Sequence, residues 1–162
     1  MRQIRHGVFE TNSSSTHSVT VRQKGLQSNY MKIHSDGYIH TELGEFGWEI
    51  ESYDGQEDKL SYLVTMLAEK NGGADIWWRS DKTRQELVQD LMKTKDFKRI
   101  SKEIGTYAKC EGVIIDPSSG YIDHQSHEEY ATVQEFLNDY RIDAVEFVFG
   151  RGVVLHTDND NH

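Results

Sequence analysis

Polar side chains that could do chemistry gather in one run near the start of the chain. Residues 10–18 read ETNSSSTHS and contain a carboxylate, an amide, several hydroxyls and one histidine, but no apolar side chain. Hydroxyls and backbone N–H groups in a tight turn form a concave donor surface that accepts a phosphate or a carboxylate. His17 could act beside that surface as a positive charge or a general acid. The run has no glycine, so it is not a phosphate-binding loop of the Walker type.

Two further polar clusters each follow an apolar run. Residues 123–127 read DHQSH, and residues 157–160 read TDND. Carboxylate oxygens and imidazoles in this mixture suit a divalent metal ion, with Mg²⁺ or Mn²⁺ favoured over Zn²⁺. Cys110 is the only cysteine, so a structural zinc finger is excluded.

Each of the three clusters stands at the end of a predicted strand, where a rigid core can hold functional groups in place. We therefore predict that the clusters meet in one pocket. The predicted catalytic residues are His17, His124 and Glu10, the predicted substrate-binding residues are Asn12, Ser13, Ser14, Ser15 and Thr16, and the predicted metal ligands are Asp123, Asp158 and Asp160.

Two alternatives to this pocket stay open. Ser, Thr, Asn and Asp satisfy backbone groups in turns and helix caps, and this role explains each cluster taken singly. A Ser-His-Asp hydrolase could be built from a serine of residues 13–15 with His17 and Asp123, but the G-x-S-x-G motif is absent. A turn needs only two to five residues of this kind, whereas residues 10–18 contain nine in succession, which favours a site.

Strand signals surround the polar clusters. The β-favouring runs RQIRHGVF and SVTVRQ flank the first cluster, and S-D-G at residues 35–37 predicts a hairpin. GVIID and SGYIDHQS, joined by Pro117 to Gly120, predict a second hairpin. Two strands are predicted about residues 150–152, with the following side chains of the first strand pointing inward: Val145, Phe147 and Phe149.

Helix signals alternate with these strands. Residues 58–70 carry leucines at helical spacing before a stop at Asn71-Gly72-Gly73, and helices are also predicted after capping boxes at Thr83 and Thr132. The period continues from Phe97 to Tyr107, with a break near Thr94. The predicted fold is α+β, a single domain over residues 1–162 with a mostly antiparallel sheet and about three to four helices.

Composition and charge limit the class of protein. A chain of 162 residues with 10% aromatic residues is long enough and apolar enough to bury one core. No apolar run reaches the roughly 18 residues of a membrane span, and the first residues lack the apolar stretch of a signal peptide. With a single cysteine, these features predict a cytoplasmic protein with no membrane partner.

The net charge of -9 is concentrated near the C-terminus, where residues 123–162 hold two basic and nine acidic side chains (2 - 9 = -7). Such a region repels nucleic acid and suits a metal ion, a basic protein partner or solubility. Residues 93–102, KTKDFKRISK, are the exception, with five basic side chains and one acidic (5 - 1 = +4). A helical surface with this pattern could touch phosphates, but most such runs are solvated faces, so the sequence gives no strong nucleic-acid signal.

The opening RHGVFETNSSSTHSV resembles the N-terminus of small uncharacterised proteins encoded by bacteriophages and prophages, which share the ETNSSSTHS block. Residues 121–126 (YIDHQS) and 157–161 (TDNDN) are similar to later segments of such proteins. The resemblance implies a phage origin, a location in the host bacterial cytoplasm and one shared site built from the three clusters. It implies no particular reaction.

Two functions from different classes follow. The first is a pocket that binds, and hydrolyses or transfers, a phosphate-bearing small molecule or nucleotide with the help of a divalent metal ion. The second is a non-catalytic anti-defence inhibitor that docks its acidic C-terminal surface onto a basic host defence protein.

Overall fold

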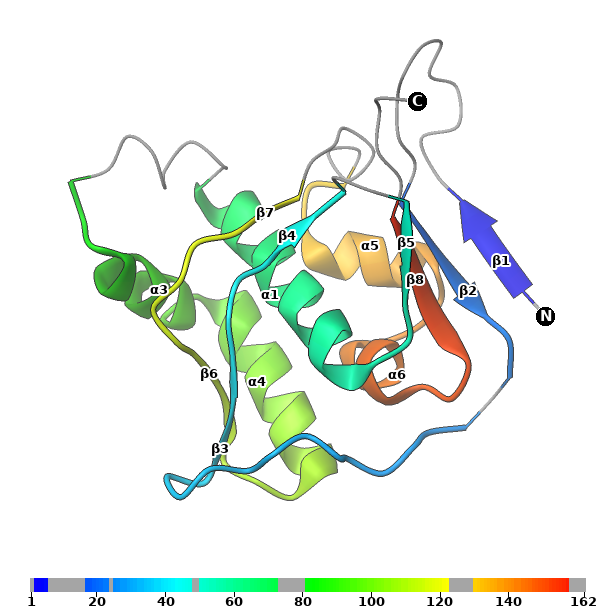
Figure 1. The fold of residues 1–162 in the computed structure, drawn as a ribbon, viewed down its shortest axis with the longest axis horizontal. Coiled ribbons are helices and arrows are strands. Elements are labelled where there is room, and N and C mark those ends of the chain that lie inside the picture. The colour runs from blue at the N-terminus through cyan, green and yellow to red at the C-terminus, as the bar shows by residue number, and fades with distance from the viewer. Residues whose placement is uncertain are drawn as a thin grey trace, which may run out of the picture.

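The computed structural model describes residues 2–5, 17–23, 25–47, 50–72, 81–122 and 130–157. Within these ranges, helices and strands alternate along the chain, and the helices gather beside one main sheet (Figure 1). The strands are β1 (Arg2–Arg5), β2 (Ser18–Val21), β3 (Tyr38–Thr41), β4 (Glu45–Phe46), β5 (Glu51–Tyr53), β6 (Gly112–Ile115), β7 (Tyr121–Ile122) and β8 (Val153–Thr157). The helices are α1 (Gln56–Gly72), α3 (Arg84–Met92), α4 (Lys95–Ala108), α5 (Val133–Asp139) and α6 (Ala144–Phe149).

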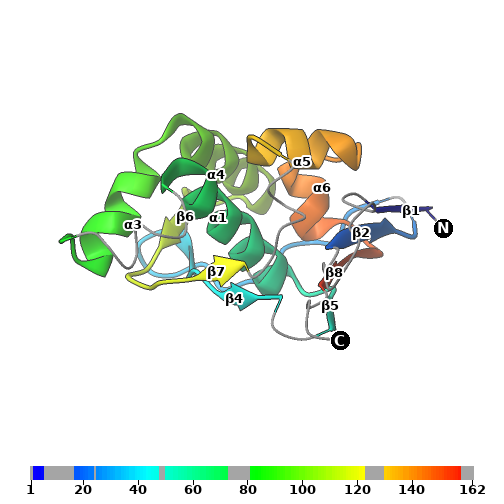
Figure 2. The same ribbon diagram turned by 90° about the horizontal axis from the view of Figure 1, so that it is seen from above.

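The main sheet has four antiparallel strands in the order β1-β2-β8-β5. The prediction that two strands flank the first polar cluster is confirmed, because β1 and β2 pair with Arg5 opposite Ser18. Apolar side chains of β2 and β8 alternate into the core, where Val19, Val153 and Leu155 are buried. The sheet therefore packs one face against the helices, at one end of the molecule as seen from above (Figure 2).

The predicted hairpin of residues 112–122 is wrong. β6 pairs in parallel with β3, and β7 pairs in parallel with β4, so residues 112–122 run in the same direction as residues 38–46. Between the two strand pairs, the Tyr121 amide donates a backbone hydrogen bond to Gly44 O at 2.8 Å. Gly120 allows this approach, since a Cβ there would lie 2.5 Å from the Gly44 oxygen. Residues 117–120 therefore join two strands, β6 and β7, that both pair with the segment of residues 38–46.

Around residues 35–37, where a hairpin was predicted, the chain forms a turn that one isolated antiparallel bridge extends. The Gly37 amide donates to His34 O at 2.9 Å, and Ile33 pairs with Ile39 as an isolated antiparallel bridge. Gly37 has a positive φ of 89°, which glycine adopts without strain.

The strand predicted to place Val145, Phe147 and Phe149 inward is wrong, because these residues lie in α6. Asp143 caps this helix by accepting a 2.7 Å hydrogen bond from the Glu146 amide. A short apolar run fits a buried helix as well as a strand, and the local cap decides in favour of the helix. The second predicted strand of this region is confirmed as β8.

The other predicted helices are confirmed. Thr83 forms its capping box with Glu86, and Thr94 caps α4 at the predicted break. Thr132 caps α5 by accepting from the Glu135 amide, while the Glu135 carboxylate accepts from the Ala131 amide. The described residues thus form five helices, one more than the predicted upper number, and the additional helix is α6.

One hydrophobic core joins these elements, and α1 runs through its centre (Figures 1 and 2). Tyr62, Leu63, Val64, Met66 and Leu67 of α1 are all fully buried, so this helix is covered on every side along that stretch. The predicted α+β class is confirmed. None of the described helices combines the length and apolar character needed to cross a membrane.

Candidate functional site

His17 lies directly before β2, with its side chain only 4% exposed. Its Nδ1 is 3.0 Å from the hydroxyl of Tyr62 on α1, and the Tyr140 hydroxyl donates to the His17 carbonyl at 3.4 Å. Burial raises the pKa of Tyr62 well above its ordinary value, and the nearby Tyr140 and Glu69 raise it further. Tyr62 therefore keeps its proton, and two tyrosines from the helical layer fix both the ring and the backbone of His17.

The strand ends beside His17 belong to the same edge of the main sheet. Ser18 pairs with His156 of β8, and Thr157 pairs with Glu51 of β5. β1 and β8 end at this edge, and β2 and β5 begin there (Figure 1). Ser18, the last residue of the first polar cluster, and the strand that leads into the third cluster are therefore neighbours.

The strand that leads into the second cluster reaches the same region through aromatic contacts. Ile122, the last residue of β7, pairs with Phe46, whose ring centroid lies 5.2 Å from that of Tyr62. The Ile122 amide donates to the Glu69 carboxylate of α1 at 2.6 Å. Both views place the end of β7 near the ends of β4 and β5 (Figures 1 and 2).

A connected group of aromatic rings, which we call the aromatic floor, packs beneath these strand ends. Tyr62 is at its centre, because its ring contacts members from β4, α5 and α6, and its hydroxyl contacts His17. The aromatic floor consists of Phe46, Tyr53, Tyr62, Tyr130, Phe136, Tyr140 and Phe147. Such packing holds the strand ends in fixed positions relative to one another.

The structure thus describes the strand ends from which the predicted site extends. Of the predicted site residues themselves, it describes His17. The remaining predicted residues lie outside the described residues, and their roles stay predictions: Glu10, Asn12, Ser13, Ser14, Ser15, Thr16, Asp123, His124, Asp158 and Asp160. Within the described ranges, no three His, Cys, Asp or Glu side chains are grouped so that they could hold a metal ion. The predicted metal ligands fall outside those ranges, so the metal site also stays a prediction.

His156 of β8, which the sequence did not single out, lies at this same edge. Its Nε2 is 2.8 Å from the Thr20 hydroxyl and its Nδ1 is 2.9 Å from the Ser52 hydroxyl. These contacts tie three neighbouring strands together. The alternation of side chains places His156 on the face of β8 opposite the buried Leu155, so it differs from His17, which faces the aromatic floor.

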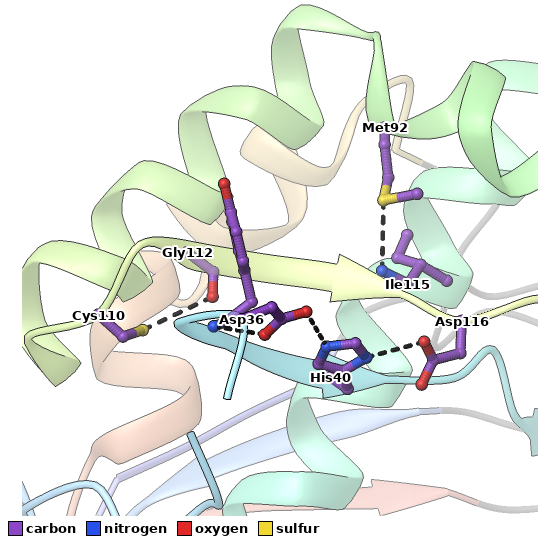
Figure 3. A network of polar contacts seen from close by, with 8 residues as sticks. Asp36, His40, Met92, Cys110, Gly112, Ile115 and Asp116 are labelled. Carbon is purple, nitrogen blue, oxygen red and sulfur yellow. Dashed lines mark hydrogen bonds and ion pairs between the residues drawn. The ribbon is translucent and has the colours of Figure 1, made fainter. Parts of the chain in front are cut away.

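A second histidine that the sequence did not single out lies away from this edge, on β3. His40 contacts Asp36 through Nε2 at 2.7 Å and Asp116 through Nδ1 at 2.8 Å, as Figure 3 shows. Hydrogen bonds with Asp116 and Asp36 raise the pKa of His40 above its ordinary value. The His34 ring packs on it with centroids 4.2 Å apart.

His40 and Asp116 line a depression of about 540 Å³ together with His34 and several other carboxylates of the chain. Both ring nitrogens of His40 are occupied by carboxylates, so this histidine is a charged clamp rather than a general base. It joins the turn before β3 to the residue that follows β6. The spacing of Asp36 and His40 is visible in the sequence, but Asp116 is 76 residues away from His40.

Comparisons with protein-family models, with curated proteins and with solved structures find no match. The resemblance of the opening residues to phage proteins therefore stays a prediction, and the functional argument rests on the geometry of the site.

Proposed function

We propose that the strand-end site around His17 binds a phosphate-bearing small molecule or a nucleotide. The observation that carries this proposal is the position of His17, which two tyrosines hold in a buried place at the edge where the polar clusters are anchored. Binding and proton transfer both need groups that are fixed before the ligand arrives. A histidine used only to end a turn would not need two tyrosine contacts from the helical layer.

The proposed chemistry divides three tasks among the predicted site residues. Residues 12–16 bind the phosphate through hydroxyl and backbone N–H donors. His17 or His124 transfers a proton, with Glu10 as a second acid or base. The three predicted aspartates hold Mg²⁺ or Mn²⁺, which neutralises phosphate charge. Hydrolysis or transfer of the phosphate-bearing group is the reaction class that these groups support.

Thermal unfolding in the presence of candidate ligands tests the proposal. The ligands are inorganic phosphate and nucleoside mono-, di- and triphosphates, each with and without Mg²⁺ or Mn²⁺. A ligand present at about 100 times its Kd stabilises the folded state by about 2.7 kcal/mol. For a chain of this size, that corresponds to a rise in Tm of about 5 to 10 °C. The absence of any shift with all of these ligands would contradict the proposal.

Two variants and a matched control test whether the ligand binds at His17. His17→Gln should weaken binding at least about tenfold, because the imidazole is lost. Tyr62→Phe removes only the hydroxyl that contacts His17 and keeps the ring in the aromatic floor, so a smaller loss is expected. His34→Gln changes a half-buried histidine outside the strand-end site and should leave binding unchanged. Equal losses in all three variants would argue against a site at His17.

We also propose docking on a basic host defence protein as the second candidate. It is favoured by exposed acidic side chains that α5 and α6 carry within the acidic C-terminal region, among them Glu135 and Glu146. Charge reversal at Glu135 and Glu146 to lysine separates the two candidates. It should abolish docking and leave ligand binding by the strand-end site intact.

A further inference from the structure

Four basic side chains of α4 lie on one side of the helix. Lys95, Lys98, Arg99 and Lys102 are all exposed, and together they form what we call the basic face. At about 100° per residue, these four positions fall within an arc of about 100° on one side of the helix. The opposite side, with Phe97, Ile100 and Ile104, is buried in the core.

Cations normally stabilise the C-terminal end of a helix, where the peptide dipoles place negative charge. α4 has no basic residue in its last turn, although Lys109 is its C-cap, and its first turn contains Asp96 besides two members of the basic face, Lys95 and Lys98. These two lysines add to the positive end of the dipole, which costs stability and strengthens attraction for anions. Asp96 and Lys109 follow the dipole preference, whereas Lys95 and Lys98 do not.

Most of the basic face is not neutralised by neighbouring carboxylates. Arg99 lies 3.7 Å from Asp96, and Glu103 flanks the face in a half-buried position. Among the residues that the structure describes, Lys95, Lys98 and Lys102 form no ion pair. At least three cations therefore remain available to a partner, in a chain whose net charge is -9.

We propose that the basic face of α4 binds the sugar-phosphate backbone of nucleic acid. Cations one turn apart are about 5 Å from each other along the helix, so that each can reach a different phosphate. A membrane partner fits less well, because interfacial helices insert an apolar face and that of α4 is already buried in the core. A protein partner also fits less well, since the basic face has no exposed aromatic or aliphatic side chain to form an interface centre.

The expected binding is electrostatic and independent of sequence. With three or four phosphates contacted, the logarithm of the association constant should fall with the logarithm of salt concentration at a slope of about -3 to -4. The acidic remainder of the chain weakens association, so a Kd of about 10⁻⁴ to 10⁻⁶ M is expected, as for other non-specific contacts. This site lies on α4 and is separate from the strand-end site.

Fluorescence anisotropy with a labelled duplex DNA of about 20 base pairs, at salt concentrations from about 25 to about 200 mM, tests the proposal with the full chain. The triple variant Lys95→Gln, Lys98→Gln, Lys102→Gln should lose at least about tenfold in affinity, and its salt slope should become shallower by about 3. The matched control Arg22→Gln, Lys32→Gln, Arg151→Gln removes the same charge from exposed positions elsewhere and should change affinity by less than about threefold.

Three results would overturn the proposal. They are no duplex binding by the unaltered chain at the lowest salt, equal losses in the two triple variants, or binding to phosphatidylserine vesicles without binding to the duplex. Melting temperatures that stay the same or rise slightly show that the variants still fold, as expected for exposed positions and for the removal of Lys95 and Lys98 from the positive end of the helix dipole. His17→Gln should keep its duplex affinity, so that failure of the strand-end site and failure of the basic face are distinguished.

Discussion

Lys59 is a lysine buried in the core of the protein. Its side chain is 1% exposed, and its Nζ donates one hydrogen bond to Val153 O at 3.0 Å. Burial lowers the pKa of Lys59 to about 8, and the negative charge of Asp54 opposes this change only in part. We predict that replacing this lysine by methionine, which has a similar size but no charge, makes the stability of the protein less dependent on pH.

The size of the effect follows from the two pKa values. In the unfolded chain the Lys59 pKa is near its ordinary 10.5, against about 8 in the folded state. At about 1.4 kcal/mol for each tenfold change in the proton equilibrium, this difference corresponds to about 3 kcal/mol. Between about pH 8 and pH 10.5 the unfolded chain binds more protons, so the stability of the unaltered protein rises with pH through that window.

Lys59→Met removes both the titration and the hydrogen bond to Val153 O, and the lost bond costs about 1 kcal/mol. The variant should therefore be more stable than the unaltered protein by about 2 kcal/mol at pH 7. Near pH 10.5 it should be less stable by about 1 kcal/mol.

Urea unfolding followed by tryptophan fluorescence, at pH values from about 7 to about 10, measures this difference. Groups that titrate in both proteins cancel, because only the difference between the two proteins is compared. Lys32→Met makes the same chemical change at an exposed lysine and should produce no comparable trend. A difference between Lys59→Met and the unaltered protein that stays constant across this range would refute the reasoning.

Three further predictions concern the clamp, a helix cap and a strand contact. His40→Gln should destabilise the protein below pH 6.5, with the difference vanishing as pH rises through the raised folded pKa of His40; urea unfolding at several pH values measures it. Thr132→Ala should cost about 1 kcal/mol of stability in urea unfolding, because the cap of α5 is lost. Gly120→Ala should lower stability by at least about 2 kcal/mol through its clash with Gly44 O. Gly55→Ala, whose added Cβ would have no neighbour closer than 3.5 Å, should cost much less, and similar losses at both glycines would contradict this explanation.

Local signals predicted the helices well because the groups that determine them are close in sequence. Thr83 and Thr132 accept hydrogen bonds from amides three residues later, so a short motif contains the interaction. Asp143 makes the same contact with Glu146 before α6. The apolar run that follows it alternates as a strand does, and a strand was predicted from that alternation alone.

Strand pairing was predicted less well because it depends on distant residues. The turn residues at 117–120 indicated a hairpin, which is the nearest pairing available to residues 112–122. The structure instead pairs them with residues 38–46, about seventy positions earlier, through a parallel register that needs the intervening helices as a crossover. No local pattern distinguishes these two arrangements.

The same limit applies to the candidate site. Residue type and spacing identified the polar run around His17, but the tyrosines that hold His17 are 45 and 123 residues away. Local spacing gives neither Tyr62 nor Tyr140 a place beside His17. What brings them there is the contact of their hydroxyl groups with His17, and only the folded chain defines that contact.

Environment therefore separates histidines that look alike in the sequence. His40 is held between two carboxylates, so its imidazole is stabilised in the charged form and both nitrogens are occupied. His17 instead contacts Tyr62, which keeps its proton, and directly follows the hydroxyl-rich residues 11–16 in the sequence. Two carboxylates already balance a positive charge on His40, whereas the contact with Tyr62 brings no negative charge to His17. On this ground we propose His17, rather than His40, as the histidine that binds a phosphate ligand.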